Sequence, residues 1–244
     1  MIKKIYLLCL SLILVSPKVY AWGLQELGQE AASPYTTSAR YTLYAGALIT
    51  ATFAIFEDQV VDPFQDKQVR NKTLGDSSRW GDWMGQMIPN VLYVGGMAIA
   101  SQYGDTKAHD RAIGMFKATA YAASVTTILK YSIREPRPND NSTKNSFPSG
   151  HTTTSFAFSG YVAAEHDWGW GSAALLLSTF TAYSRINDNM HRLQDVTAGA
   201  TIGWVYGWGI ARLKKQEKEK DEKEAFIAPI LDSQTAGLSL YSQF

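Results

Sequence analysis

Three residue types that carry chemistry stand close together between Ser184 and Asp195. Arg185 comes first, His191 follows six positions later, and Asp195 stands four positions beyond it. Side chains at i and i+4 lie on one face of a helix, so the carboxylate could orient the imidazole and leave its second ring nitrogen nucleophilic. Arg185 offers a planar fork of donors for an oxyanion or a phosphate. An amphipathic helix with a surface ion pair explains this stretch equally well, so the rest of the sequence has to decide.

A second group of such residues is the segment Pro148-Ser149-Gly150-His151. Proline followed by serine is typical of a helix start, where backbone N–H groups form an anion site. Gly150 would let an anion approach the backbone closely, and Ser149 adds a hydroxyl donor. His151 would stand at the rim, where it could pass a proton to a leaving group. On its own, this segment also fits a capped helix with an incidental histidine.

Two further cations lie upstream of these groups. Lys130 is placed near the end of an expected helix, and Arg137 follows seven positions later between Pro136 and Pro138. The prolines break any helix, so the loop is irregular and could bring both cations onto one anion. Three cations, two neutral donors and two histidines form an inventory for phosphoryl transfer without a metal, because cations and a helix start would stabilise charge on the equatorial oxygens.

Taken together, the clusters resemble a three-part family signature. Lys-x6-Arg-Pro, Pro-Ser-Gly-His and Ser-Arg-x5-His-x3-Asp follow one another here between Lys130 and Asp195, and every position is filled. This order resembles the type 2 phosphatidic acid phosphatase (PAP2) family, which includes bacterial class A acid phosphatases, lipid phosphate phosphatases and vanadium haloperoxidases. One departure is the loop of residues 139–147, which is short for the family and could alter the rim of the pocket.

The resemblance implies a role for each residue of the signature. His191 would be the nucleophile that forms a phosphohistidine, Asp195 would orient it, and His151 would be the general acid. The substrate phosphate would be held by Lys130, Arg137, Ser149, Gly150 and Arg185. No cofactor is expected, although vanadate could enter the same anion cage as an inhibitor or, in a haloperoxidase, as a prosthetic group.

Apolar segments of helical character recur along the chain, and no strand pattern appears among them before residue 225. We expect helices over residues 41–56, 91–102, 110–133, 149–165, 172–183 and 190–213. They predict an all-α bundle of about six helices that occupies residues 22–213 and turns its apolar faces inward. A long polar stretch, residues 59–90, separates the first two helices.

The chain changes character beyond residue 213. Residues 214–224 are nearly all charged, which favours a solvated helix extension or a linker. The segments from Phe226 to Leu231 and from Gly237 to Phe244 are typical of two short strands around a polar turn. We therefore expect a short C-terminal strand pair, a hairpin over residues 225–244.

The N-terminus has the features of an export signal. Lys3 and Lys4 precede an apolar run from Ile5 to Val15, and Val19-Tyr20-Ala21 offers small residues at a cleavage site. We expect a signal peptide over residues 1–21 and a mature chain in the periplasm or cell envelope. No later segment reaches about 18 uninterrupted apolar residues, which favours a soluble or surface-bound body over one that crosses the membrane several times.

Other classes of function find little support in the sequence. The net charge of +1, without a basic stripe, argues against nucleic-acid binding. The pairs His109-Asp110 and His166-Asp167 are typical of helix caps and surface charges, so we expect no metal. The chain also contains no glycine-rich nucleotide loop of the Walker type.

The sequence therefore predicts a metal-independent phosphatase for phosphomonoesters, with a lipid phosphate or polyprenyl pyrophosphate as the favoured substrate. Trp80, Trp83, Trp168 and Trp170 could form an apolar rim for a lipid tail or contact a membrane surface, although helix packing explains them equally well. The alternatives are a broad acid phosphatase for small phosphomonoesters, a vanadium haloperoxidase, and a non-catalytic envelope protein. The oligomeric state is left open by the sequence.

Overall fold

The structure of the chain is a computed structural model that describes residues 24–223, 226–232 and 235–241. The expected signal peptide, residues 1–21, lies outside the described residues. The described residues form nine α-helices, a π-helical turn η1 and a 3-10 turn η2: α2 (Leu24–Thr36), α3 (Ala39–Ile55), η1 (Glu57–Val61), α4 (Asp62–Asn71), η2 (Gly75–Ser77), α5 (Ser78–Gly85), α6 (Ile88–Gln102), α7 (Thr106–Ile133), α8 (Gly150–Glu165), α9 (Trp168–Asn187) and α10 (Leu193–Lys223). The all-α prediction for the body of the chain is confirmed.

The expected number of about six helices is too low, because α2 precedes the first expected helix and the polar stretch 59–90 is itself helical. α4 has a proline in its first turn and ends at Lys72, which adopts a left-handed conformation with φ 42°. Gln65 is the buried residue of α4, and the buried residues of α5 are Ser78, Gly81 and Gly85. The buried faces of these short helices are mostly small or polar, so no apolar stripe in the sequence points toward the core.

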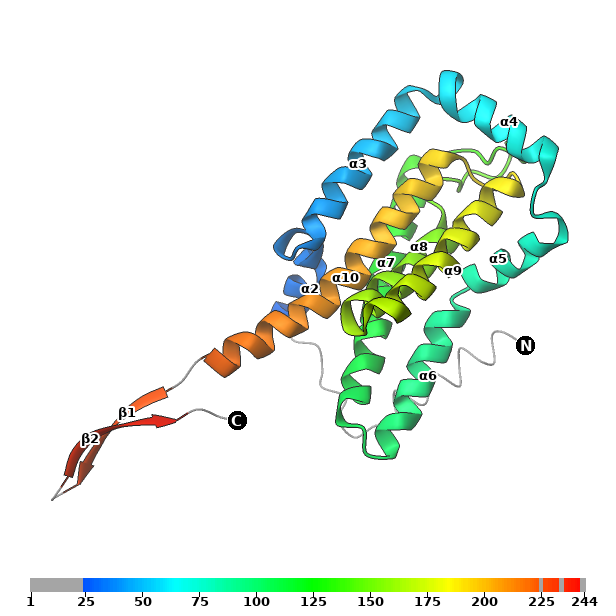
Figure 1. Cartoon of the computed structure of the whole chain (residues 1–244). Helices are drawn as coiled ribbons and strands as arrows, with labels where there is room; N and C mark the ends of the chain where they lie inside the picture. The colour runs from blue at the N-terminus through cyan, green and yellow to red at the C-terminus, as the bar shows by residue number, and fades with distance from the viewer. Residues whose placement is uncertain (1–23, 224–225, 233–234, 242–244) are drawn as a thin grey trace.

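α10 is the central helix of the bundle, with α8 along one side and α3 and α7 against its other faces (Figure 1). Gly199, Gly203 and Gly207 stand every fourth residue on the side that faces α8. A Cβ at Gly203 would collide with the carbonyl oxygen of Thr153, and one at Gly199 would lie 2.6 Å from that of Ser149. The two backbones therefore touch, which glycine alone permits, and the start of α10 is fixed beside the start of α8.

The core lies where α7, α8 and α10 meet. Met115, Tyr161 and Ile210, one from each helix, belong to a single buried cluster. α2 joins this core through Lys117, whose Nζ lies 2.5 Å from a carboxylate oxygen of Glu26 and 2.5 Å from one of Glu30. Lys117 and Glu30 are both buried, so removing Lys117 would leave the charge of Glu30 uncompensated in the interior.

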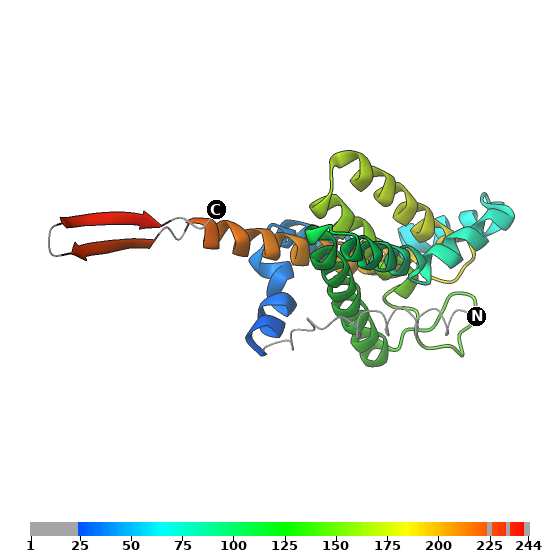
Figure 2. The ribbon, with the colours of Figure 1, turned by 90° about the horizontal axis from the view of Figure 1, so that it is seen from below.

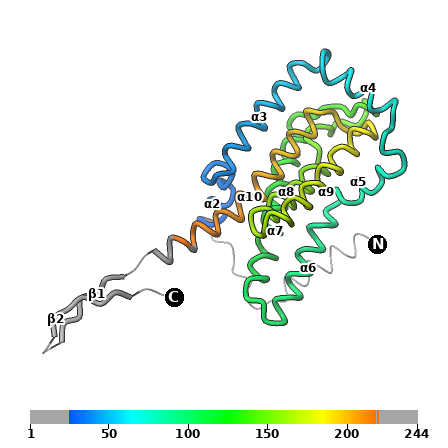
Figure 3. The backbone as a smooth tube through the Cα atoms, in the orientation of Figure 1, coloured from blue at the N-terminus to red at the C-terminus, as the bar shows by residue number. Residues whose placement is uncertain are grey.

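The chain bends by 83° between α3 and the helical segment Glu57–Asn71, as the backbone trace shows (Figure 3). The bend carries α4 to the end of the bundle at which α9 ends. There Gln65 Nε2 donates hydrogen bonds to Ile186 O at 3.3 Å and to Asn189 Oδ1 at 2.9 Å. α5 packs against α9 and α8. Seen from below, α4 and α5 gather at one end of the molecule and the strands lie at the other (Figure 2).

α7 is the described helix that is long and apolar enough to cross a membrane by itself, and α3 with η1 and α4 passes the same test as a bent pair. Because 44% of the apolar window of α7 is buried, this helix also serves the core. Large apolar side chains are exposed on α3, α6 and α7, among them Leu48, Ile55, Leu92, Ile128 and Tyr131. The outer surface of the bundle is therefore apolar over several helices.

Two strands follow α10, which stays helical through the charged run up to Lys223. β1 (Phe226–Asp232) and β2 (Thr235–Tyr241) are antiparallel, with Phe226 opposite Tyr241 and Asp232 opposite Thr235. Two views show the pair beyond the C-terminal end of α10 and away from the helices (Figures 1 and 2). The strands therefore lie at the end of α10 opposite to Leu193.

Candidate active site

The structure places the eight signature residues at four helix termini and in the loop that joins two of them. They are Lys130 in the last turn of α7, Arg137 in the loop of residues 134–149, Ser149, Gly150 and His151 at the start of α8, Arg185 in the last turn of α9, His191 just before α10, and Asp195 in the first turn of α10. Direct contact between the backbones of α8 and α10 holds two of these termini together.

His191 lies in the turn before α10, and the expectation that it shares a helical face with Asp195 is wrong. α10 begins at Leu193, so Asp195 is its third residue. Asp195 Oδ2 accepts a hydrogen bond from the backbone N–H of Arg192 at 2.9 Å, as the third residue of a capping box does. The same oxygen lies 3.5 Å from His191 Nδ1. The pair therefore forms because the carboxylate reaches back to cap its own helix.

Ser146 is a buried partner of this pair that the sequence did not reveal. Its hydroxyl donates a hydrogen bond to Asp195 Oδ2 at 2.6 Å, and its oxygen lies 3.4 Å from His191 Nδ1. His191 is 1% exposed, and Asp195 and Ser146 are fully buried. Ser146 belongs to none of the three motifs, so no spacing rule could have identified it. Its hydrogen bond adds to the forces that fix the orientation of the carboxylate.

Burial decides the charge of His191. It lowers the pKa of the imidazole to about 4, although the hydrogen bond and the charge of Asp195 act in the opposite direction. Lys130 and Arg137 lower this pKa further because a second positive charge nearby is unfavourable. At neutral pH the ring is therefore uncharged. Because Nδ1 faces the carboxylate, the proton belongs on Nδ1 and the lone pair on Nε2.

The loop that follows α7 holds two cations through one asparagine. Lys130 Nζ donates hydrogen bonds to the backbone oxygens of Asn145 at 2.5 Å and of Ser146 at 3.3 Å. Arg137 Nε donates to the side-chain oxygen of Asn145 at 2.7 Å. These acceptors are neutral, so they orient the two cations without neutralising them.

The start of α8 lies next to these cations. Ser149 is the N-cap residue, as expected, although its side chain does not cap the helix. Its backbone N–H donates to the carbonyl oxygen of Asp195 at 2.9 Å, and its hydroxyl accepts from Thr152 at 3.0 Å. A Cβ at Gly150 would lie 3.8 Å from Lys130 Cε. The ammonium group therefore stands beside a helix N-terminus, which is a favourable place for an anion.

Arg185 and His151 are linked by Asp82 of α5, which the sequence did not single out. Asp82 Oδ1 accepts a hydrogen bond from Arg185 Nη1 at 2.6 Å and lies 3.2 Å from His151 Nε2. The second contact does not have the alignment of a hydrogen bond. Asp82 belongs to the polar stretch 59–90, and nothing in its neighbours marks it in the sequence.

The charges of Arg137 and Arg185 lower the pKa of neighbouring side chains in the site, which indicates that these side chains lie close together. Burial and the charge of Arg137 together lower the pKa of Lys130 to about 8. Burial and the charge of Arg185 lower the pKa of Arg137. Burial followed by the charge of Arg185 lowers the pKa of His151 to about 4. Positive side chains that repel one another at one site are stabilised when an anion binds between them, so this arrangement favours an anion.

The site can thus accept a phosphoryl group on a neutral buried imidazole, spread its charge over cations and a helix start, and exchange a proton with a second imidazole. All eight predicted residues take part in this arrangement, and their chemical roles stay predictions. Within the part of the chain that the structure describes, no group of three or more histidine, cysteine, aspartate or glutamate side chains could hold a metal ion.

Fold and site together define an all-α protein with a histidine–aspartate pair and three cations gathered at helix termini. Residues 111–219 match the family model described as the PAP2 superfamily, so this part of the chain is similar to that superfamily. All eight signature residues fall inside the match. Helices α2 to α6, including Asp82, lie before it.

A curated relative is the lipid A 1-phosphatase of Porphyromonas gingivalis. The two proteins are 39% identical over 82 residues, which make up 32% of this chain and 18% of the relative. The chain is therefore similar to less than a fifth of that protein's length. No solved structure matches the chain.

Proposed function

We propose that this protein is a phosphatase that hydrolyses phosphomonoesters through a phosphohistidine intermediate. The observation that carries the proposal is the neutral imidazole of His191, which is buried, held by Asp195 and surrounded by cations. A neutral imidazole is a nucleophile, and the cations are placed where negative charge would develop. The PAP2 match of residues 111–219 and the lipid A 1-phosphatase relative support the same reaction class.

The proposed reaction has two steps. His191 Nε2 attacks phosphorus, the ester P–O bond breaks, and His151 gives its proton to the leaving oxygen, so that the alcohol departs. Water then attacks the phosphohistidine, the N–P bond breaks, and the water proton returns to His151. Lys130, Arg137 and Arg185 stabilise the charge of the phosphoryl oxygens in both steps.

Lys130 gives this mechanism a testable pH dependence. Its pKa of about 8 means that the free protein loses this positive charge as the pH rises through that value. One of three cations is then missing, so kcat/KM is expected to fall above about pH 8 for a nitrophenyl phosphate, whose leaving oxygen needs no proton from His151. Lys130→Arg stays charged at these pH values and is expected to keep a flatter profile up to about pH 10. Identical alkaline limbs in both proteins would show that Lys130 does not titrate in this reaction.

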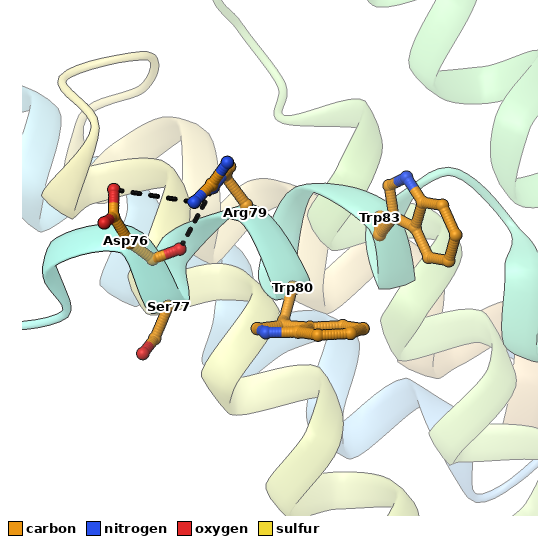
Figure 4. Close-up of a pocket in the computed structure, with 5 residues that line it drawn as sticks. All are labelled: Asp76, Ser77, Arg79, Trp80 and Trp83. Carbon is orange, nitrogen blue, oxygen red and sulfur yellow. Dashed lines mark hydrogen bonds and ion pairs between the residues drawn. The ribbon is translucent and has the colours of Figure 1, made fainter.

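The proposed substrate class rests on α5. Trp80 and Trp83 are exposed on its outer face and meet edge to face, with ring centroids 6.2 Å apart (Figure 4). An open pocket of about 370 Å³ beside them is lined by Asp76, Ser77, Arg79, Trp80 and Trp83. The same short helix carries Asp82, which contacts Arg185. An apolar surface so close to the cations suits an ester with an apolar alcohol, such as a lipid phosphate or a polyprenyl pyrophosphate.

The outer surface of the bundle agrees with a substrate that resides in a membrane. Exposed apolar side chains on α3, α6 and α7, such as Leu48, Leu92 and Ile128, would lower the free energy of contact with lipid. We therefore propose that the protein is exported to the periplasm or cell envelope and contacts a membrane surface there.

The substrate proposal is tested with two phosphate monoesters, one with a long alkyl chain in mixed micelles and one with a short chain in solution. Replacing Trp80 and Trp83 together by alanine is expected to lower kcat/KM about tenfold for the long-chain ester, about 1.4 kcal/mol of binding, and to leave the short-chain ester unchanged. Trp168→Ala is the matched control, because Trp168 is 81% exposed on α9 and lies outside the pocket.

Equal losses on both esters would favour the broad acid phosphatase for small phosphomonoesters. No phosphate release from any ester in a panel from sugar phosphates to lipid phosphates would contradict the phosphatase itself. The anion cage would also take vanadate, and we expect vanadate to compete with the substrate.

A further inference from the structure

Asp82 connects two groups to which the proposed reaction gives different tasks. Its Oδ1 lies 2.6 Å from Nη1 of Arg185, which would hold the phosphate, and 3.2 Å from Nε2 of His151, which would protonate the leaving oxygen. Its Oδ2 accepts a hydrogen bond from Gln86 Nε2 at 2.9 Å. Three helices therefore meet at one carboxylate: α5 with Asp82, α8 with His151 and α9 with Arg185.

The local packing gives this carboxylate a fixed position. The Arg185 side chain is 3% exposed and the Asp82 side chain 39% exposed, so a desolvated guanidinium meets a half-buried counter-ion. Gly81 and Gly85 on either side of Asp82 let α5 approach closely, since a Cβ at Gly85 would lie 2.5 Å from His151 Cβ. Small residues on both sides thus bring the Asp82 backbone within reach of both partners.

The charges that act on His151 are mostly positive. Burial opposes a proton on the ring most, and the charges of Arg185 and Arg137 oppose it as well. Asp82 is the group that favours the proton. A general acid must carry a proton before it can give one away, so the negative charge of Asp82 supports the task proposed for His151.

Building on the phosphatase mechanism above, we propose that Asp82 is a positioning residue. Its Oδ1 aligns the Arg185 guanidinium and the His151 imidazole on the same side of the phosphoryl group, and its charge favours the proton that His151 gives to the leaving oxygen.

The test uses two esters that differ in the need for a proton donor. An alkyl phosphate has a poor leaving group that needs protonation, and a nitrophenyl phosphate carrying the same alkyl chain has a good one that does not. Asp82→Asn keeps the size of the side chain but loses its charge. We expect kcat/KM to fall roughly 100-fold for the alkyl ester, within the range of general acid catalysis, and less than about tenfold for the aryl ester.

The pH profile provides the second readout. Removing a negative charge beside His151 disfavours the imidazolium, so the alkaline limb of kcat/KM for the alkyl ester is expected to move to lower pH in Asp82→Asn. Asp82→Glu keeps the charge and is expected to restore the limb. Asp66→Asn is the control, since Asp66 is exposed on α4 and lies outside the pocket beside α5.

Equal losses of activity on the two esters, or an unmoved alkaline limb, would overturn the positioning role even if the phosphatase proposal holds. A wild-type protein without phosphate release would remove the mechanism and this role together. Circular dichroism and thermal unfolding of each variant separate either result from a failure to fold.

Discussion

Replacing His191 with alanine is expected to reduce phosphate release by about 10⁴-fold or more, because the nucleophile of the first step is gone. The cations Lys130, Arg137 and Arg185 remain in this variant and would still bind the ester. KM is therefore expected to change much less than kcat. Rapid-quench experiments on the wild type should also trap a phosphoryl-protein that is labile in acid and stable in base, and the variant should lack it.

The matched control for this experiment is His109→Ala. His109 lies in the first turn of α7, away from the helix termini that form the site. We expect this control to hydrolyse the ester at the wild-type rate. Full activity of His191→Ala would eliminate the phosphohistidine, and loss of activity in both variants would indicate a general effect on the fold.

The second large effect is expected for Gly203→Val in the centre of α10. A side chain there collides with the carbonyl oxygen of Thr153 on α8, so the two helices must move apart. Backbone atoms cannot rearrange as a flexible side chain does, and we expect a loss of about 3 kcal/mol or more in the free energy of unfolding. Activity should fall as well, because the same helix contact aligns Ser149 with Asp195. Urea unfolding and phosphate release measure the two effects.

Gly95→Val on α6 is the control for this substitution. It makes the same chemical change in a helix, but a Cβ at Gly95 would meet nothing within 4 Å. We expect its stability to change by less than about 1 kcal/mol, since β-branching and helix propensity are then the main contributions. Similar losses in the two variants would show that the contact between α8 and α10 contributes little.

The grouping of the candidate site residues could be predicted from the sequence because their types are costly to bury and unusual in combination. Three cations and two histidines at fixed spacings have few structural explanations. The structure brings all of them to adjoining helix termini. Lys130 and Arg137 illustrate the limit of this reasoning, because their shared partner Asn145 depends on how the loop folds.

The sequence could not predict what lies between the motifs. Asp82 and Ser146 enter the site from a polar stretch and an irregular loop, where no periodicity fixes the direction of a side chain. His191 shows a different failure, since the correct pair was predicted for a wrong reason. The i, i+4 spacing suggested a helical face, whereas the contact arises from the cap of α10.

The position of α4 and α5 was also beyond sequence reasoning. The buried faces of both helices are mostly small or polar, so no apolar stripe in the sequence points toward the core. Their place at the end of the bundle depends on the bend after α3 and on contacts such as that of Gln65 with Ile186. Such contacts form only when the tertiary structure is complete.

The carboxylate of Asp195 has both a structural and a proposed catalytic role, since it caps α10 and orients His191. A helix cap of this kind contributes about 1 kcal/mol to stability whether or not the protein catalyses anything. A descendant that no longer needed the reaction would therefore still be under selection to keep this aspartate for folding. The His191 side chain caps no helix, so we expect it to be the first of the two residues to be replaced when catalysis is lost.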